Sequence, residues 1–163
     1  MNTMFYYNKL FLKIIVIAYK DEGESIFFYI NNGEEIVYSG LVDSYQNDDN
    51  KYIQEVLSSL GISKLDFLCW SHPHDDHSMG MMEILRKYVG KNTKIVYPES
   101  LLSIKEKYLS ENSKNTINLL QEINRTRING KNRPKRMIAC VSKTIENINL
   151  GDYHEIVVEL RRG

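Results

Sequence analysis

Three of the four histidines in this chain fall within six residues, in the stretch SHPHDDHSMG at 71–80. Imidazole nitrogens and carboxylate oxygens are ligands that zinc, iron and manganese accept. Residues two apart in an extended segment face the same side, so His72 and His74 are placed to bind one ion, with Pro73 stiffening the pair. Asp76 and His77 follow where the chain turns into a helix, which can aim them at a second ion. Two ions bridged by hydroxide form a hydrolytic centre.

The alternative interpretation is a solvated surface loop that is rich in histidine. A buried strand before the cluster and a helix after it favour the metal site, because together they supply the context that such a motif needs. Single residues nearby are interpreted more conservatively. Asp75 is expected to be a solvated carboxylate, and His154, which stands beside Tyr153 in a predicted turn, is expected to be a surface histidine.

The elements that must position this cluster can be read from hydrophobic periodicity. Three strands are expected to form an antiparallel meander, with Asn31, Asn32 and Gly33 supplying the positive φ of a tight hairpin turn. Strand–helix–strand units follow, which makes a mixed α/β domain whose ligands collect beyond the carboxyl ends of strands. Strands are expected at 10–19, 25–30, 34–42, 64–70 and 93–98, helices at 51–60, 78–90 and 99–125 with a break near 110–115, and two short strands around a Gly151–Asp152 turn.

Composition narrows the class of protein. A length of 163 residues indicates one domain, 1–163, and the 21 basic and 21 acidic residues imply no global attraction to nucleic acid or to anionic membranes. Cys69 and Cys140 form no CxxC pair, and Cys69 is expected to be buried. The apolar N-terminal run is interrupted by Lys9 and Lys13 and is too short to span a bilayer. These features predict a cytoplasmic protein without a targeting or membrane segment.

The stretch HPHDDH at 72–77 resembles the H-x-H-x-D-H signature of the metallo-β-lactamase fold superfamily. The flanks DEGESIFFYINNGEEIVYSGLVDS at 21–44 and LSSLGISKLDFLCWSHPHDDHSMGM at 57–81 look like that family's opening strands and metal loop, and INLGDYHEIVVEL at 148–160 resembles a later strand pair. The resemblance is closest to the branch found in bacterial competence proteins that take up DNA. It implies an αββα sandwich, of which this chain holds only the first half or a truncated version.

By that resemblance, His72 and His74 match ligands of the first metal, and Asp76 and His77 match ligands of the second. Asp43 matches the strand-end acid that supports the site. The family's second half contributes further ligands that this sequence does not supply, since Asp152 and His154 precede the last predicted strand instead of following it. The chain is therefore expected to be either a half that a partner protein or self-association completes, or a relic that binds metal weakly.

A basic run lies between residues 125 and 136, where Gly130 and Pro134 predict a loop. Phosphate contact is one interpretation and a solvated loop is the other, and the absence of interleaved aromatic residues argues against sequence-specific reading of nucleic acid. The basic residues are Arg125, Arg127, Lys131, Arg133, Lys135 and Arg136.

Two functions remain open at this stage. The first is a hydrolase that uses one or two zinc ions, or manganese or iron, to cleave a phosphodiester or similar ester, with Asp76 orienting the attacking hydroxide. The second is a non-catalytic half or degenerate module that works by associating with a partner protein. The absence of a signal sequence argues against β-lactam hydrolysis, which calls for a secreted protein.

Overall fold

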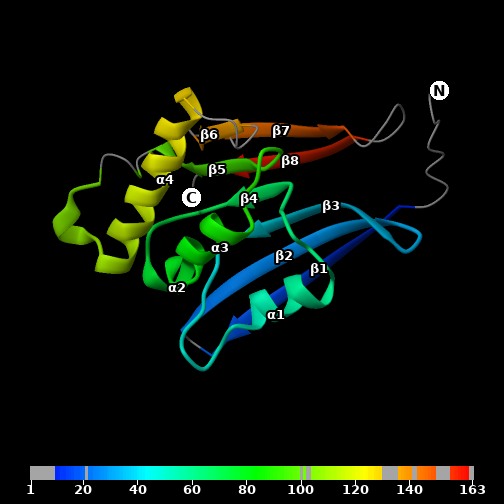
Figure 1. The fold of residues 1–163 in the computed structure, drawn as a ribbon, viewed down its shortest axis with the longest axis horizontal. Helices are drawn as coiled ribbons and strands as arrows, with labels where there is room; N and C mark the ends of the chain where they lie inside the picture. The colour runs from blue at the N-terminus through cyan, green and yellow to red at the C-terminus, as the bar shows by residue number, and fades with distance from the viewer. Residues whose placement is uncertain are drawn as a thin grey trace.

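A six-stranded mixed sheet organises the chain in the computed structural model, and a two-stranded sheet follows it (Figure 1). The structure describes residues 10–20, 22–99, 101, 104–129, 136–140, 143–149 and 155–161. The strands of the large sheet lie in chain order, from β1 at one edge to β6 at the other. The expected mixed α/β class is therefore confirmed.

The first three strands form the predicted antiparallel meander. They are β1 (Leu10–Tyr19), β2 (Gly23–Asn32) and β3 (Glu35–Val42). Gly33 turns the second hairpin with φ of +63°, as expected. The prediction for Asn31 and Asn32 was wrong, because both extend β2 past a register shift at Ile30/Asn31 instead of adopting positive φ. The turn is thus shorter than predicted, and one glycine is enough to form it.

The remaining strands of the large sheet run parallel to β3. They are β4 (Phe67–Cys69), β5 (Lys94–Pro98) and β6 (Arg136–Cys140). The sequence predicted two strands in the C-terminal region, whereas the structure has three, because β6 joins the large sheet and the other two pair with each other. Parallel pairing brings the carboxyl ends of β3 and β4 side by side, where the histidine cluster begins.

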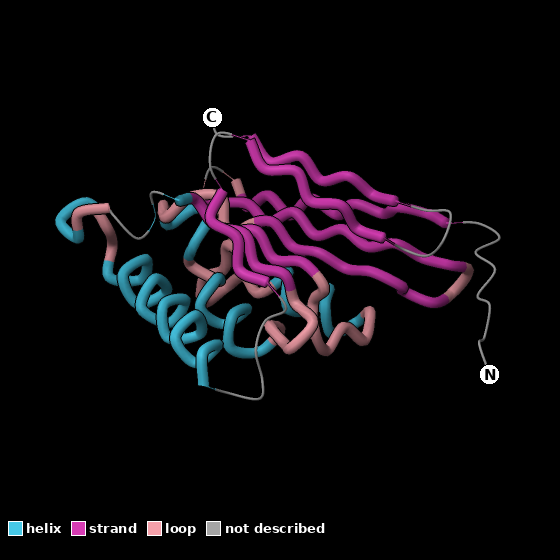
Figure 2. Tube along the Cα trace, turned by 90° about the horizontal axis from the view of Figure 1, so that it is seen from above, coloured by secondary structure: helices cyan, strands magenta, loops and turns pink. Residues whose placement is uncertain are grey.

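Helices connect these strands in the described part of the chain, and Figure 2 shows them on one side of the sheet. Gly61 ends the first helix with φ of +67°, as the C′ glycine was expected to do. Two predictions need correction: the helix expected over 78–90 is the shorter Met81–Lys87, preceded by a separate turn at Asp75–Ser78, and the helix expected from residue 99 begins at Glu111, within the expected break. The helices are α1 (Tyr52–Ser59), α2 (Asp75–Ser78), α3 (Met81–Lys87), η2 (Glu106–Tyr108) and α4 (Glu111–Asn129).

Each face of the large sheet carries its own apolar cluster. The helical face buries strand residues such as Phe27, Leu41 and Leu68 against helical residues such as Leu57 and Ile84. The opposite face buries a smaller set, Ile30, Tyr38, Phe67, Cys69 and Val96. The burial of Cys69 confirms the expectation for that residue. Alternation along each strand directs successive side chains to the two clusters.

The last two strands, β7 (Lys143–Asn149) and β8 (Glu155–Arg161), form an antiparallel pair. Figure 2 shows this pair on the side of the large sheet that faces away from the helices. The predicted turn at Gly151–Asp152 and the predicted surface residue His154 lie outside the described residues. Among the helices that the structure describes, none combines the length and the apolar character needed to cross a membrane.

Candidate metal site

The loop at residues 71–77, hereafter the histidine loop, starts where β4 ends. Trp70 is buried and continues the ladder, since its backbone N–H donates to the Val96 carbonyl at 2.9 Å. The Trp70 indole Nε1 donates to the Ser78 hydroxyl at 3.0 Å, and Ser78 is fully buried at the end of α2. One buried hydrogen bond therefore ties the residue before the loop to the residue after it.

The second half of this loop is already helical, which the sequence did not predict. His74 is extended, with φ of −81° and ψ of 152°, and it caps α2. Its carbonyl accepts from the His77 N–H at 3.0 Å. Asp76 and His77 therefore project from a helical turn, while His72 projects from the extended segment before it.

Asp43 anchors the site from the end of β3. It is buried and accepts three hydrogen bonds: from the Ser71 backbone N–H at 2.7 Å, from the Ser71 hydroxyl at 2.6 Å and from His77 Nδ1 at 2.8 Å. Its φ of +56° lies in the left-handed region, which costs energy for a residue with a side chain and is best tolerated by Asp and Asn. Asp43 thus makes the contacts expected of the strand-end acid.

These bonds assign the tautomers of two histidines. A carboxylate only accepts, so the His77 Nδ1 must carry a proton, and in the neutral ring the lone pair is then on Nε2. The Ser71 hydroxyl gives its only proton to Asp43, so it accepts from His72 Nδ1 at 2.9 Å. His72 therefore also presents an unprotonated Nε2. A carboxylate behind a ligand histidine is the arrangement that orients imidazoles toward metals.

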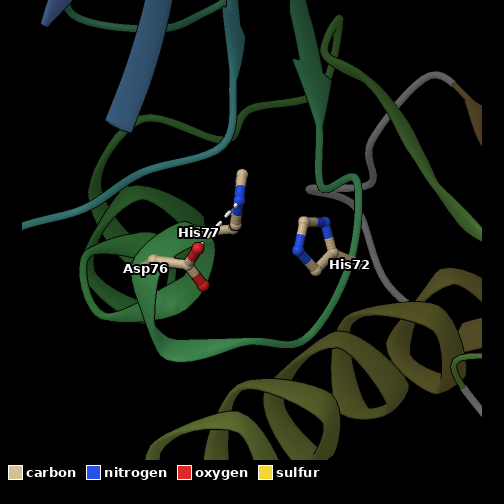
Figure 3. Close-up of side chains that lie close together, drawn as sticks. All are labelled: His72, Asp76 and His77. Atoms are coloured by element: carbon tan, nitrogen blue, oxygen red, sulfur yellow. Dashed lines mark ion pairs between the residues drawn. The ribbon is translucent and has the colours of Figure 1, made fainter. Parts of the chain in front are cut away.

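His72, Asp76 and His77 form the cluster that results (Figure 3). One ligand atom from each lies within 4.8 Å of the others. The His77 Nε2 is 3.2 Å from Asp76 Oδ2, and the His72 and His77 ring centroids are 3.9 Å apart. Two zinc–nitrogen bonds of about 2.1 Å hold their nitrogens no more than about 4.2 Å apart, so small side-chain rotations suffice to bring the three donors onto one ion.

His74 is near this cluster but not part of it. Its ring meets the His72 ring edge-on, with centroids 4.9 Å apart. The expected grouping put His72 with His74 on one ion, and Asp76 with His77 on another. The structure instead brings His72 together with Asp76 and His77, because the helical turn at Asp75 swings the last two toward the extended segment. Which of the four residues bind metal stays a prediction.

Burial lowers the pKa of His72 below its ordinary value of 6.5, and the neighbouring His77 adds to the effect. Asp43 and Asp76 oppose the shift without cancelling it. A ring whose charged form is disfavoured is neutral at pH 7 and offers a lone pair. The surroundings of His72 therefore favour the protonation state that a metal ligand needs.

The N-terminus of α4 holds the histidine loop from the other side. The Ser113 hydroxyl donates to the Pro73 carbonyl at 2.6 Å, and the Ser110 hydroxyl donates to Asp75 Oδ1 at 2.5 Å. The Ser113 N–H in turn donates to the Ser110 hydroxyl at 3.1 Å. Sequence reasoning missed both serines and Ser71. A serine three residues before another at a helix start is an N-cap signal, but nothing local shows what else it contacts.

A glycine lets β2 approach the site closely. A Cβ on Gly23 would lie 2.6 Å from the Asp76 carbonyl oxygen and 2.3 Å from the Tyr45 ring. Two residues later, the buried Ser25 hydroxyl accepts from the Tyr45 N–H at 2.9 Å. The Gly-Glu-Ser stretch at 23–25 thus packs the start of β2 against α2 and the segment after Asp43.

The basic run does not form one loop. Arg125 and Arg127 belong to α4, and Arg136 begins β6, so the prediction of a continuous loop was wrong for these positions. Lys131, Arg133 and Lys135 lie outside the described residues. The helix rises about 1.5 Å per residue, which puts Arg125 about 21 Å along α4 from Glu111. Its exposed side chain is therefore far from the end of α4 that touches the histidine loop.

Comparison with known proteins gives distant likenesses among solved structures alone. No protein-family model matches the chain, and no curated protein matches it. Among solved structures, the chain is similar to a "putative metallo-beta-lactamase" from Thermotoga maritima, at 13% sequence identity and a TM-score of 0.46. The likeness covers 80% of this chain and 58% of that protein, so the chain matches little more than half of that structure's length.

Proposed function

We propose that the histidine loop binds a divalent transition metal, zinc foremost, and that the site belongs to a metal-dependent hydrolase. The observation that carries the proposal is the cluster of His72, Asp76 and His77, in which Asp43 and Ser71 direct both imidazole Nε2 atoms toward the shared space. Zinc, manganese and iron all accept this donor set. His74, whose ring contacts His72, is proposed as a further ligand.

Bound metal would supply Lewis-acid activation of water and of a substrate oxygen. The chain's own residues would do the rest. Asp43 keeps the proton on His77 Nδ1, and the Ser71 hydroxyl keeps the one on His72 Nδ1. Asp76, whose side chain is 48% exposed, is proposed to accept a hydrogen bond from the attacking water and orient it.

A phosphodiester or similar ester is the proposed substrate, in line with the resemblance to the competence-protein branch. The position of Arg125 constrains this proposal. A small substrate held at the cluster would not reach the basic positions of α4, whereas an extended polyanion would touch both regions. Nucleic acid is therefore favoured over a nucleotide if the basic residues contribute to binding.

The alternative function is a non-catalytic module that binds metal, or only keeps the loop, and acts through a partner. One observation favours it: among the described residues a single cluster of three donors could hold a metal, which is fewer than a di-metal hydrolytic centre needs. The hydrolase requires both metal binding and turnover, whereas the alternative requires no turnover.

The test uses a matched pair of carboxylates. Asp76→Asn should weaken zinc binding at least tenfold in calorimetric titration, because it removes a proposed ligand. Asp75→Asn changes the adjacent exposed carboxylate outside the cluster and keeps an oxygen that accepts from the Ser110 hydroxyl, so it should leave zinc affinity within about twofold. An unaltered zinc isotherm in Asp76→Asn, or no binding by the wild type, would contradict the proposed site.

Turnover separates the two functions. Slow hydrolysis of bis(p-nitrophenyl) phosphate that requires zinc and is lost in Asp76→Asn would support the hydrolase. Stoichiometric zinc binding with no hydrolysis above the metal-only control would favour the non-catalytic module. Because binding and turnover are measured on the same samples, a failure of one does not obscure the other.

A further inference from the structure

Strand β1 exposes a row of apolar side chains at the edge of the large sheet. The row, hereafter the outer row, consists of Leu12, Ile14 and Val16, which are 59%, 60% and 62% exposed. Four of the seven large hydrophobic side chains that are exposed in the described part of the chain lie on this one strand. Scattered exposed hydrophobic residues are ordinary, but a contiguous row indicates a contact surface.

The row continues an existing core. Ile14 lies opposite Phe28 in the β1–β2 register, and Leu12 lies opposite Ile30. Ile30 belongs to the apolar cluster on the sheet face away from the helices, and Phe28 packs against that cluster. The outer row of β1 therefore extends this packed cluster to the edge of the sheet, where its side chains are exposed.

The edge of β1 has few of the features that usually protect an edge strand. Proteins block such edges with charged residues, prolines, bulges or short strands. This strand has ten residues, no proline and an unbroken register with β2, its partner among the described strands. Its one charged residue, Lys13, lies over the Tyr29 ring at 5.5 Å, on the opposite face from the outer row.

We propose that β1 pairs with β1 of a second copy of the chain, antiparallel and about a two-fold axis, to join two six-stranded sheets into one. An isologous contact needs a surface that complements itself. With the axis at Ile14, Leu12 of one copy lies opposite Val16 of the other, and Lys13 lies opposite Ile15. No like charges face each other in this register.

The net charge of the chain permits this occupant, and the size of the strand limits its affinity. The chain has 21 basic and 21 acidic residues, so two copies do not repel each other through net charge. A standard interface uses about 20–30 residues from each side, and a ten-residue strand offers less than that. The dimer is therefore weak and forms in a concentration-dependent way. The proposal does not depend on the metal site.

Sedimentation velocity of the full chain over a concentration series tests the proposal. The weight-average mass should rise from that of a 19.1 kDa monomer toward twice that value. Ile14→Lys should hold the chain at the monomer mass, because it places two ammonium groups opposite each other at the axis. Ile14→Val should retain association. Tyr52→Lys, which adds the same charge at a residue 47% exposed on α1, should associate like the wild type.

Hydrogen exchange on the wild type keeps the test decisive if Ile14→Lys does not fold. Amides of β1 should exchange more slowly at high than at low protein concentration, with little change in α1. The proposal is overturned if the wild type stays monomeric, if folded Ile14→Lys associates normally, or if β1 gains protection only when a different protein is added.

Discussion

The histidine loop, which follows β4, and strand β1 differ in how many elements of the chain contact them. Loop residues are held from three sides, by Asp43 at the end of β3, by Trp70 at the end of β4 and by Ser113 on α4. The outer row of β1 is held from one side only, by its pairing with β2. The loop is therefore restrained by its own chain, whereas the outer row of β1 is exposed.

This difference follows from what each region contains. Polar atoms withdrawn from water must find partners within the chain, so the loop recruits three elements to satisfy them. An exposed apolar side chain costs less free energy than a buried polar atom without a partner, because its cost is proportional to the apolar area left in water. The fold therefore tolerates uncovered side chains at β1 but not unpaired polar atoms in the loop. The following predictions test that contrast, from the largest effect to the smallest.

Removing the anchor of the loop should have the largest effect. Asp43→Ala leaves three donors without their acceptor and puts alanine at positive φ, so we expect it to lower the free energy of unfolding by about 3 kcal/mol. Urea unfolding of the metal-free protein measures this loss. A change below about 1 kcal/mol would show that the loop does not depend on its anchor.

Asp43→Asn distinguishes the effect of Asp43 on stability from its effect on the tautomer of His77. Asparagine tolerates the same φ and still accepts from the Ser71 N–H, so it should be less destabilising than alanine. Its amide N–H₂ would donate to His77 Nδ1 and shift the ring proton to Nε2. Zinc affinity should then fall about 10–100-fold in calorimetric titration. Equal zinc affinity in Asp43→Asn and wild type would contradict the tautomer assignment.

The hydrogen bond from α4 should matter less than the anchor. Ser113→Ala leaves the Pro73 carbonyl without its 2.6 Å donor, and we expect a loss of about 1 kcal/mol in the free energy of unfolding. Ser59→Ala, which removes an exposed bond within the first helix, is the matched control and should change stability by less than about 0.5 kcal/mol. Indistinguishable values for the two variants would show that α4 does not restrain the loop.

The lowered pKa of His72 predicts a small dependence of stability on pH. In the folded metal-free chain this ring binds a proton less readily than in the unfolded chain, so the unfolded state holds more protons as pH falls through 6.5. Stability should therefore decrease from pH 7 toward the folded-state pKa of His72. An NMR titration should place the His72 midpoint below 6.5. A midpoint above that value would reverse the sign and contradict the assigned environment.

The outer row of β1 should give the smallest effect on stability. Val16→Thr keeps the β-branched shape on a side chain that is 62% exposed, and the free energy of unfolding of the dilute chain should change by less than about 0.5 kcal/mol. Leu41→Ala in the covered core should cost about 2–5 kcal/mol by comparison. A large loss in Val16→Thr at low concentration would mean that this chain itself covers the row.

Much of the architecture could be predicted from local sequence, because short-range patterns determine it. Alternation and β-branched residues located the first three strands, and the glycines Gly33 and Gly61 marked a turn and a helix end through their need for positive φ. The histidine spacing located the candidate site. Each of these features depends on residues that are close in the chain, where backbone sterics and hydrophobic periodicity act directly.

What the sequence by itself determined is therefore the strands from β1 to β5, the mixed class and the position of the histidine loop after a buried strand. The tertiary structure decided how the donors group. Asp43 is 34 residues from His77, and Ser113 is 40 residues from Pro73, yet these contacts orient the loop. Hydrogen bonds over such separations depend on which strands pair and which helix packs above them. No local pattern carries that information, so the sequence did not reveal which long-range contacts hold His77 and the loop in place.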